Sequence, residues 1–194
     1  MITRAKLSSV VQGLPKYRSM LAGNTAYSPN AFESIATANP AGTSTFTFSS
    51  IPSTYQHLQI RFWNLTSVNG ESVLMRFNGD TGGNYTRHRL RGYSTTPSSS
   101  GSNGNTSMYV NSSGNGSNTT YPEFGIIDIH DYATTNKYKS MKDLNGIDIV
   151  GSGDIQFQSG LWMSTSAINS ITFLLTAGSF STGTIFALYG IKGA

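Results

Sequence analysis

HLQIRFW, residues 57–63, is the stretch of sequence that decides the fold. Its apolar residues Leu58, Ile60 and Phe62 occupy every second position, with a glutamine and an arginine between them. Successive side chains of a β-strand point to opposite faces of a sheet, whereas a helix would repeat its apolar positions every three or four residues. The stretch therefore predicts a strand with one face in a protein core and the other face toward solvent.

The same alternation returns on both sides of this stretch, in runs that recur about every 10–15 residues through the body of the chain, residues 31–194. Examples are TFTF (45–48), VLMRF (73–77), YTRHRLR (85–91) and IDIH (127–130). Turn-forming sequences, NGD (78–80) and GGN (82–84), separate two of these runs. Short strands with turns between them predict an all-β fold, either an antiparallel β-sandwich or a jelly roll.

The last two predicted strands, ITFLL (171–175) and IFALY (185–189), are apolar on both faces. One face of a sheet in an antiparallel sandwich ordinarily meets water. We therefore expect the outer side of these strands to be covered, either by the N-terminal segment or by another subunit.

A long segment of low complexity, residues 94–120, interrupts the body. It consists mostly of Ser, Gly, Asn and Thr, and Met108, Tyr109 and Val110 interrupt this composition. Long loops without secondary structure are uncommon within compact domains. The segment predicts a loop insertion that is either a flexible surface hairpin or a loop ordered by a neighbouring subunit.

Residues 1–30 differ from the body, because their apolar positions follow a helical period. The main stripe is formed by Leu7, Val10, Val11 and Leu14, and a shorter one begins at Tyr17. Gly13 and Pro15 predict an end to the first helix. Helices this short are unstable alone in water, so we expect a helical or extended arm that docks on another surface.

The net charge of +4 is located entirely in this arm. Its basic residues are Arg4, Lys6, Lys16 and Arg18, and all of them precede the first acidic residue, Glu33. The other nine basic residues balance the nine acidic residues of the chain. The neutral body argues against nucleic-acid binding by the body, and the arm is the part that electrostatic attraction would guide to a partner.

The composition excludes several classes of protein and site. The absence of cysteine excludes disulfides, cysteine-based zinc sites and thiol catalysis. No apolar run reaches the roughly 18 residues of a membrane-spanning helix. Charged residues make up 11% of the chain, against about 25% in ordinary globular proteins. Such a polar but uncharged surface suits a protein that packs against copies of itself or lies exposed on a shell.

One group of polar residues has the residue types of an acid–base or metal site. It consists of Asp128, His130 and Asp131, which His57 or His88 could complete. The alternative is an ordinary polar strand face with a local ion pair. The spacing does not demand a site, so we predict no catalytic residue here and a protein that is not an enzyme.

A second group lies in the predicted turn after residue 77. Asn78, Asp80 and Asn84 supply side-chain oxygens of the kind that calcium prefers, although the segment lacks the acidic density of calcium-binding loops. A plain turn explains the same residues. We therefore predict no metal and no cofactor.

Six residues are candidate contacts to a ligand or to another subunit. They are Trp63, Arg87, Arg89, Arg91, Tyr109 and Trp162. The three arginines share one strand face, where they could bind phosphate or an anionic sugar, or could pair with acids across a subunit boundary. The aromatic residues could stack on sugars, or they could pack in the core or in an interface.

Several strings of residues are similar to a known group of proteins. They are ITRAKLSSVVQGLPKYRSMLAGNTAY (2–27), SIPSTYQHLQI (50–60), FNGD (77–80), SGLWMST (159–165) and FALYGIKG (186–193). Together they resemble small structural proteins of tailed phages, including environmental and cyanophage-like phages, over nearly the whole chain. The resemblance implies a component of the virion and carries no catalytic motif.

We therefore expect a virion structural protein at the particle surface, made in the host cytoplasm. The leading hypothesis is an external capsid decoration or cement protein. Its arm would bind the lattice of the major capsid protein, and its body would form a homo-oligomer, expected to be a trimer. The alternative is a tail-fibre, tailspike or baseplate adhesin that binds a glycan of the host surface. No contact with a membrane is expected.

Overall fold

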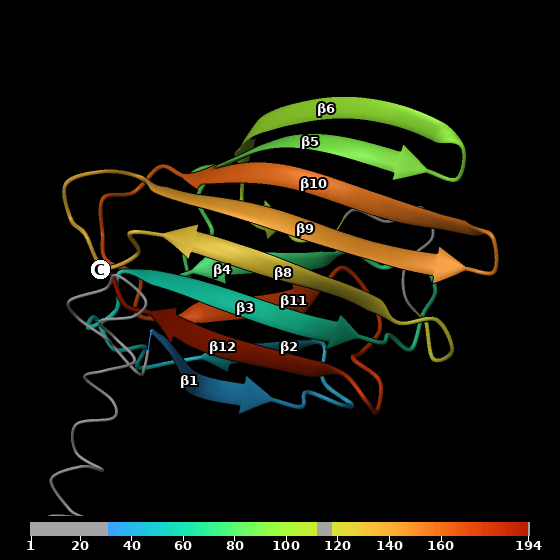
Figure 1. Cartoon of the computed structure of the whole chain (residues 1–194), viewed down its shortest axis with the longest axis horizontal. Helices are drawn as coiled ribbons and strands as arrows, with labels where there is room; N and C mark the ends of the chain where they lie inside the picture. The colour runs from blue at the N-terminus through green and yellow to red at the C-terminus, as the bar shows by residue number, and fades with distance from the viewer. Residues whose placement is uncertain (1–30, 112–117, 194) are drawn as a thin grey trace, which may run out of the picture. The chain divides into compact units, whose positions relative to one another are not determined.

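The computed structural model describes residues 31–111 and 118–193, and the fold is all-β within these two ranges (Figure 1). The strands are β1 (Phe32–Ala38), β2 (Thr45–Phe48), β3 (His57–Asn64), β4 (Val73–Phe77), β5 (Tyr85–Tyr93), β6 (Thr96–Asn105), β7 (Met108–Tyr109), β8 (Glu123–His130), β9 (Lys139–Ile149), β10 (Ser152–Trp162), β11 (Ile171–Leu175) and β12 (Ile185–Ile191). The described ranges contain no helix long and apolar enough to cross a membrane. The predicted arm, residues 1–30, lies outside them.

The strands form two antiparallel sheets, which confirms the predicted β-sandwich. The large sheet has eight strands in the order β1-β12-β3-β8-β9-β10-β5-β6, and the small sheet has four in the order β2-β11-β4-β7. In Figure 1 the large sheet lies toward the viewer, and the small sheet lies behind it. The large sheet therefore has an inner face against the small sheet and an outer face that no second layer of the described residues covers.

The register of β3 and β8 shows how the alternation in the sequence becomes an inside and an outside. Leu58 pairs with Ile129, and Ile60 pairs with Ile127. All four side chains are completely buried on the inner face. The residues between them point to the outer face, as the period of two predicts.

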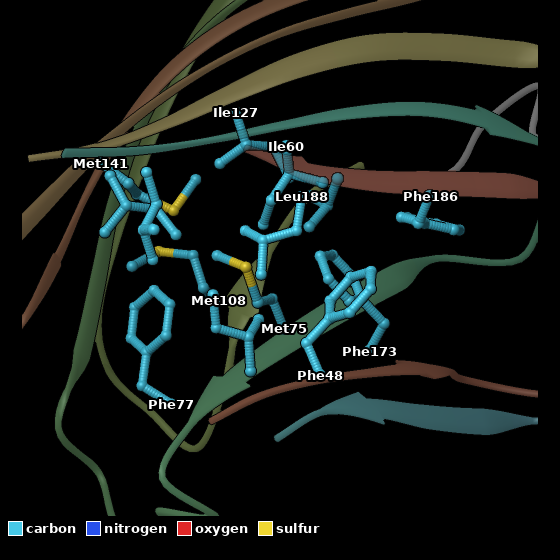
Figure 2. Packing of buried hydrophobic residues seen from close by; sticks show 14 of the residues in the cluster. Phe48, Ile60, Met75, Phe77, Met108, Ile127, Met141, Phe173, Phe186 and Leu188 are labelled. Carbon is cyan, nitrogen blue, oxygen red and sulfur yellow. The ribbon is translucent and has the colours of Figure 1, made fainter. Parts of the chain in front are cut away.

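Aromatic side chains join the two sheets, as Figure 2 shows. Phe186 of β12 stacks on Phe62 of β3, with ring centroids 5.4 Å apart. From the small sheet, the rings of Phe46 and Phe173 approach Phe186 to 4.9 and 4.7 Å. Each buried ring removes about 150–250 Å² from water, so this cluster is the main apolar contact between β12 and the small sheet.

Part of the low-complexity segment 94–120 forms regular structure. Thr96–Asn105 is β6, which pairs with β5 as a hairpin at the edge of the large sheet. Met108–Tyr109 is β7, and the buried Met108 side chain fills the space that Gly160 leaves on β10. The expectation of an irregular loop is therefore wrong for these two strands, and the hairpin alternative describes β6. Residues 112–117 lie outside the described ranges.

β12 is apolar on both faces, as its sequence suggests. Its outward Tyr189 is partly covered by residues of the same sheet. The ring of Phe32 lies 6.4 Å from it, and the guanidinium of Arg61 lies 5.4 Å from its ring centroid. Cover by the arm or by another subunit stays a prediction.

Candidate functional site

The outer face of the large sheet is divided into a polar half and an apolar half. The division follows the cross-strand rows of residues, because each row runs across β3, β8, β9, β10 and β5. One row pairs Gln59, Asp128, Lys142, Ser159 and His88 in succession. The next two rows toward the other end of the strands consist mainly of apolar residues, with Arg61 of β3 as the one charged member of the first.

The apolar half forms a continuous surface, which we call the outer apolar patch. Its members are Trp63, Leu90, Phe124, Ile126, Leu144, Ile155, Phe157 and Ile185, with exposed fractions between 40% and 61%. Isolated apolar residues are common on protein surfaces, but a contiguous cluster of this kind marks an interaction site.

Strand pairing makes the patch continuous. Ile126 of β8 pairs with Leu144 of β9, which pairs with Phe157 of β10, and Leu90 of β5 completes the row. Directly opposed side chains of neighbouring antiparallel strands lie about 5 Å apart at Cβ, so each of these four is in contact range of its neighbour in the row.

The second row of the patch begins with two aromatic residues. Trp63 and Phe124 stack with ring centroids 6.1 Å apart, at an interplanar angle of 24°. Phe124 pairs with Gly146, and Gly146 pairs with Ile155. The glycine leaves a shallow depression between the apolar side chains, lined in part by Phe124, Leu144 and Ile155.

The polar half brings together two of the histidines that were candidates for metal or acid–base chemistry. The rings of His57 and His130 lie 5.2 Å apart. The backbone N–H of Asp131 donates to His57 Nδ1 at 3.0 Å, and the Asp131 carboxylate forms an ion pair with Lys137. Burial lowers the pKa of His130, and the charges of His57 and Lys142 lower it further. Within the described residues, no group of three His, Cys, Asp or Glu side chains is arranged to hold a metal ion.

The candidate calcium loop is a turn with its own internal hydrogen bonds. Asp80 Oδ2 accepts from Trp162 Nε1 at 2.7 Å and from Asn84 Nδ2 at 2.9 Å. Burial opposes ionisation of Asp80, but these bonds and one from the Gly82 N–H lower its pKa overall. Trp162 itself is buried against the rings of Phe77 and Tyr85, so it offers no open ring face to a sugar.

The three arginines of β5 lie on the inner face of the large sheet, not on the outer one. Arg91 Nη2 and Asp154 Oδ2 form an ion pair at 2.5 Å, so this arginine pairs with an acid of its own chain. Arg89 Nη1 donates to Gln156 Oε1 at 3.3 Å. The Arg87 guanidinium lies 4.3 Å from the ring centroid of Tyr109.

A buried polar cluster on this inner face is a feature that sequence reasoning missed. Glu123 and Asp143 are buried together with the amide side chains of Asn145, Gln156 and Gln158. Gln158 Nε2 donates to Asp143 Oδ2 at 2.6 Å, and Asn145 Nδ2 donates to the same oxygen at 2.9 Å. Burial raises the pKa of Asp143 well above its ordinary value.

The sequence contains the alternation that produces this cluster, but here the buried residues are the polar ones and the exposed residues are the apolar ones. In DIQFQ (154–158) and DLNG (143–146), polar and apolar residues alternate as in any amphipathic strand. The apolar members point outward and the polar members point inward. Alternation identifies the two faces of a strand but does not state which face is buried.

No protein-family profile matches this chain, and no curated protein or solved structure is significantly similar to it.

Proposed function

We propose that the protein is a non-enzymatic structural subunit of a tailed-phage particle, an external capsid decoration protein. In this proposal the N-terminal arm binds the capsid lattice, and the body packs against copies of itself. The phage context rests on the resemblance of the sequence strings quoted above. The packing of the body against copies of itself rests on one observation of the structure, the outer apolar patch, and the role of the arm rests on its charge and apolar stripe.

The size of the patch supports a specific contact. Eight apolar side chains, about half exposed, present on the order of 700 Å² of surface. One partner of a standard protein–protein interface buries roughly 800 Å². The patch and its polar margin together are therefore large enough for a stable association.

A second copy of the chain is the partner that fits this surface best. The eight members of the patch carry no charge, Arg61 lies at its margin beside Ile126, and the body as a whole has nine basic and nine acidic residues. Two copies can therefore approach without net repulsion. When two such faces meet, the apolar rows cover each other and the polar row with Asp128 and Lys142 stays at the margin.

Substitution of Phe157 by glutamate should dissociate the oligomer that this contact forms. Phe157 lies in the centre of the patch, between Leu144 and Leu90, and is 50% exposed. A charge placed there would be buried without a partner in the complex, which we expect to weaken association by at least about a hundredfold. Light scattering after size-exclusion chromatography measures the change in mass.

Ser159→Glu is the matched control, because Ser159 lies on the same strand and the same outer face but in the polar row. It should leave the mass unchanged. Two results would contradict the proposed contact between copies. One is a wild-type protein that stays monomeric at about 100 μM, and the other is a Phe157→Glu protein with the mass of the wild type.

Deletion of residues 1–30 should leave a folded body that no longer binds capsids. Residues 32–194 form a compact unit, and the arm holds the whole charge excess of the chain. Circular dichroism checks the fold, and cosedimentation with capsids that lack the protein checks binding. Replacing Arg4, Lys6, Lys16 and Arg18 by glutamine tests the charge separately. Normal decoration by the truncated body would contradict the role of the arm.

A further inference from the structure

We propose that Arg87, Arg89 and Ser100 form a binding site for a tetrahedral oxyanion, a phosphate or a sulfate. The site lies on the inner face of the large sheet at its β5–β6 edge. It is separate from the outer apolar patch and goes beyond the proposed structural role.

Strand register places the three residues together. Arg87 and Arg89 are two positions apart on β5, so their side chains point to the same face. Ser100 of β6 is the cross-strand partner of Arg89, and Ser102 is the partner of Arg87. β6 is the outermost strand of the large sheet, so the site lies at an edge and not in the centre of the sandwich.

Several hydrogen-bonding atoms of these residues are buried without a partner. They are Nε and Nη1 of Arg87, Nε of Arg89 and Oγ of Ser100. Buried polar groups in folded proteins nearly always have a partner. On the neighbouring strand β10, Asp154 Oδ1 and Gln158 Oε1 are also buried without a partner, so none of the three cationic donor atoms is bonded even to the acceptors beside them. The cluster therefore points to an acceptor that comes from outside the chain.

No acid of the described residues forms an ion pair with Arg87 or Arg89, although the Asp154 carboxylate, which bonds Arg91, is near enough to raise the pKa of Arg89. All nine acidic residues lie in the described ranges, and none of the ion pairs formed there includes either arginine. The acids bond elsewhere, namely Glu33, Glu71, Asp80, Glu123, Asp128, Asp131, Asp143, Asp148 and Asp154. Residues 1–30 and 112–117 contain no Asp or Glu by sequence.

Arg91 on the same strand shows what the other two arginines lack. Its guanidinium lies 4.6 Å from the ring centroid of Tyr93, and its Nε and Nη2 donate to the Asp154 carboxylate. Arg87 has the equivalent aromatic neighbour, Tyr109, but no carboxylate. A ring attracts the face of a guanidinium and leaves its N–H edge unbonded, so the missing partner of Arg87 is an anion.

The electrostatic interactions at the site also favour a bound anion. Burial lowers the pKa of Arg89, and the charges of Arg87 and Arg91 lower it further, against the opposing effect of Asp154. Burial also lowers the pKa of Arg87. A bound anion would remove this mutual repulsion.

The number and origin of the donors favour a tetrahedral anion over a carboxylate. Donors come from two positions along β5 and from one position on β6 beside it, so the acceptor has to bond in several directions. A phosphate or sulfate directs oxygens in several directions and carries up to two negative charges, which matches two uncompensated arginines. A carboxylate directs its two oxygens in one plane and carries a single charge.

A titration followed by the ¹⁵N–¹H signals of the arginine Nε groups tests the site. Sodium phosphate, sodium sulfate and sodium acetate are each added to the full chain at constant ionic strength set with chloride. Thermal shifts alone would not suffice, because phosphate and sulfate also stabilise proteins by exclusion from the surface. We expect saturable shifts of the Arg87 and Arg89 signals with phosphate and sulfate, and at least about tenfold weaker binding of acetate.

Arg89→Gln should weaken phosphate binding by at least about tenfold, whereas Arg76→Gln should not change it. Arg76 is the matched control because it lies on β4 of the small sheet and donates to the Thr106 carbonyl. If Arg89→Gln does not fold, Ser100→Ala tests the same site with a smaller change.

A separate titration with glucose 6-phosphate distinguishes a free anion from a phosphate ester. Tighter binding of glucose 6-phosphate than of phosphate would identify the ester as the ligand. Linear, non-saturating shifts, equal binding of acetate, or unchanged binding by the variants would overturn the proposal.

Discussion

Replacement of Phe186 by alanine should lower the free energy of unfolding by about 3–5 kcal/mol. Phe186 is completely buried, and the rings of Phe46, Phe62, Phe173 and Phe180 all lie within 5.8 Å of its centroid. Phe62 lies in the large sheet, Phe46 and Phe173 lie in the small sheet, and Phe180 is held by backbone hydrogen bonds outside both sheets, so they cannot close the cavity. Urea unfolding followed by circular dichroism measures the loss.

Phe32→Ala is the control for this change, because it removes the same atoms from a different environment. Phe32 lies on the edge strand β1 and is 48% exposed. Its loss should cost less than about 1 kcal/mol. Equal losses from the two substitutions would show that the aromatic cluster does not hold the sheets together.

The strands whose inner side chains are apolar could be predicted from the sequence. In HLQIRFW (57–63) and IDIH (127–130), the apolar residues are also the buried ones, so hydrophobic period and burial agree. The same rule placed Arg87 and Arg89 on the opposite face from Leu90 on β5. It could not show that the arginines are on the inner face, since a period of two is symmetric between the two sides of a sheet.

The outer apolar patch could not be predicted for the same reason. Leu144, Ile155 and Phe157 have the spacing of core residues, and nothing local distinguishes them from Leu58 or Ile60. Their neighbours Asp143 and Gln158 face inward, where amide side chains and the Val110 carbonyl supply hydrogen-bond partners. The position of each strand in the sheet, a non-local property, decides which face is covered.

The edge strand β6 could not be predicted from its amino-acid composition. Residues 96–105 are rich in Ser, Gly and Asn, which have low β-propensity and give no apolar period. Pairing with β5 fixes this strand, and its side chains need no core because they lie at the edge of the sheet. This pairing places Ser100 beside Arg89, and the sequence of β6 alone does not indicate that contact.

β5 connects the two surfaces for which we propose partners. Leu90 points outward as the last member of the outer apolar patch, and its neighbours Arg89 and Arg91 point inward. A single strand at the side of the sheet therefore carries an apolar contact on one face and a basic row on the other. Variants of one face can be tested without touching residues of the other, so the oligomer and the anion site are experimentally separable.

Replacement of Glu123 by glutamine should remove a large part of the pH dependence of stability. Burial raises the pKa of Glu123 to about 8, although hydrogen bonds from Asn111 and Asn64 favour the ionised form. In the unfolded chain a glutamate has a pKa near 4.3. Between these values the folded protein holds a proton that the unfolded chain has released. Stability therefore falls as the pH rises from about 4.3 to about 8 and levels off above that, a total loss of roughly 3–5 kcal/mol from this group.

The difference in unfolding free energy between Glu123→Gln and the wild type, measured in urea from pH 5 to pH 8.5, isolates this contribution. The histidines contribute equally to both proteins, so their effects cancel in the difference. We expect the variant to gain on the wild type steadily with rising pH, reaching roughly 3–5 kcal/mol above pH 8. The stability of the variant itself should still fall with rising pH, because burial raises the pKa of Asp143 too. The control Asp148→Asn changes an exposed position on β9 and should shift stability by less than about 0.5 kcal/mol at every pH.

A difference between Glu123→Gln and wild type that does not vary with pH would contradict this prediction. It would mean that Glu123 is already ionised in the folded protein at pH 5. The buried cluster would then hold a charge where we place a neutral acid.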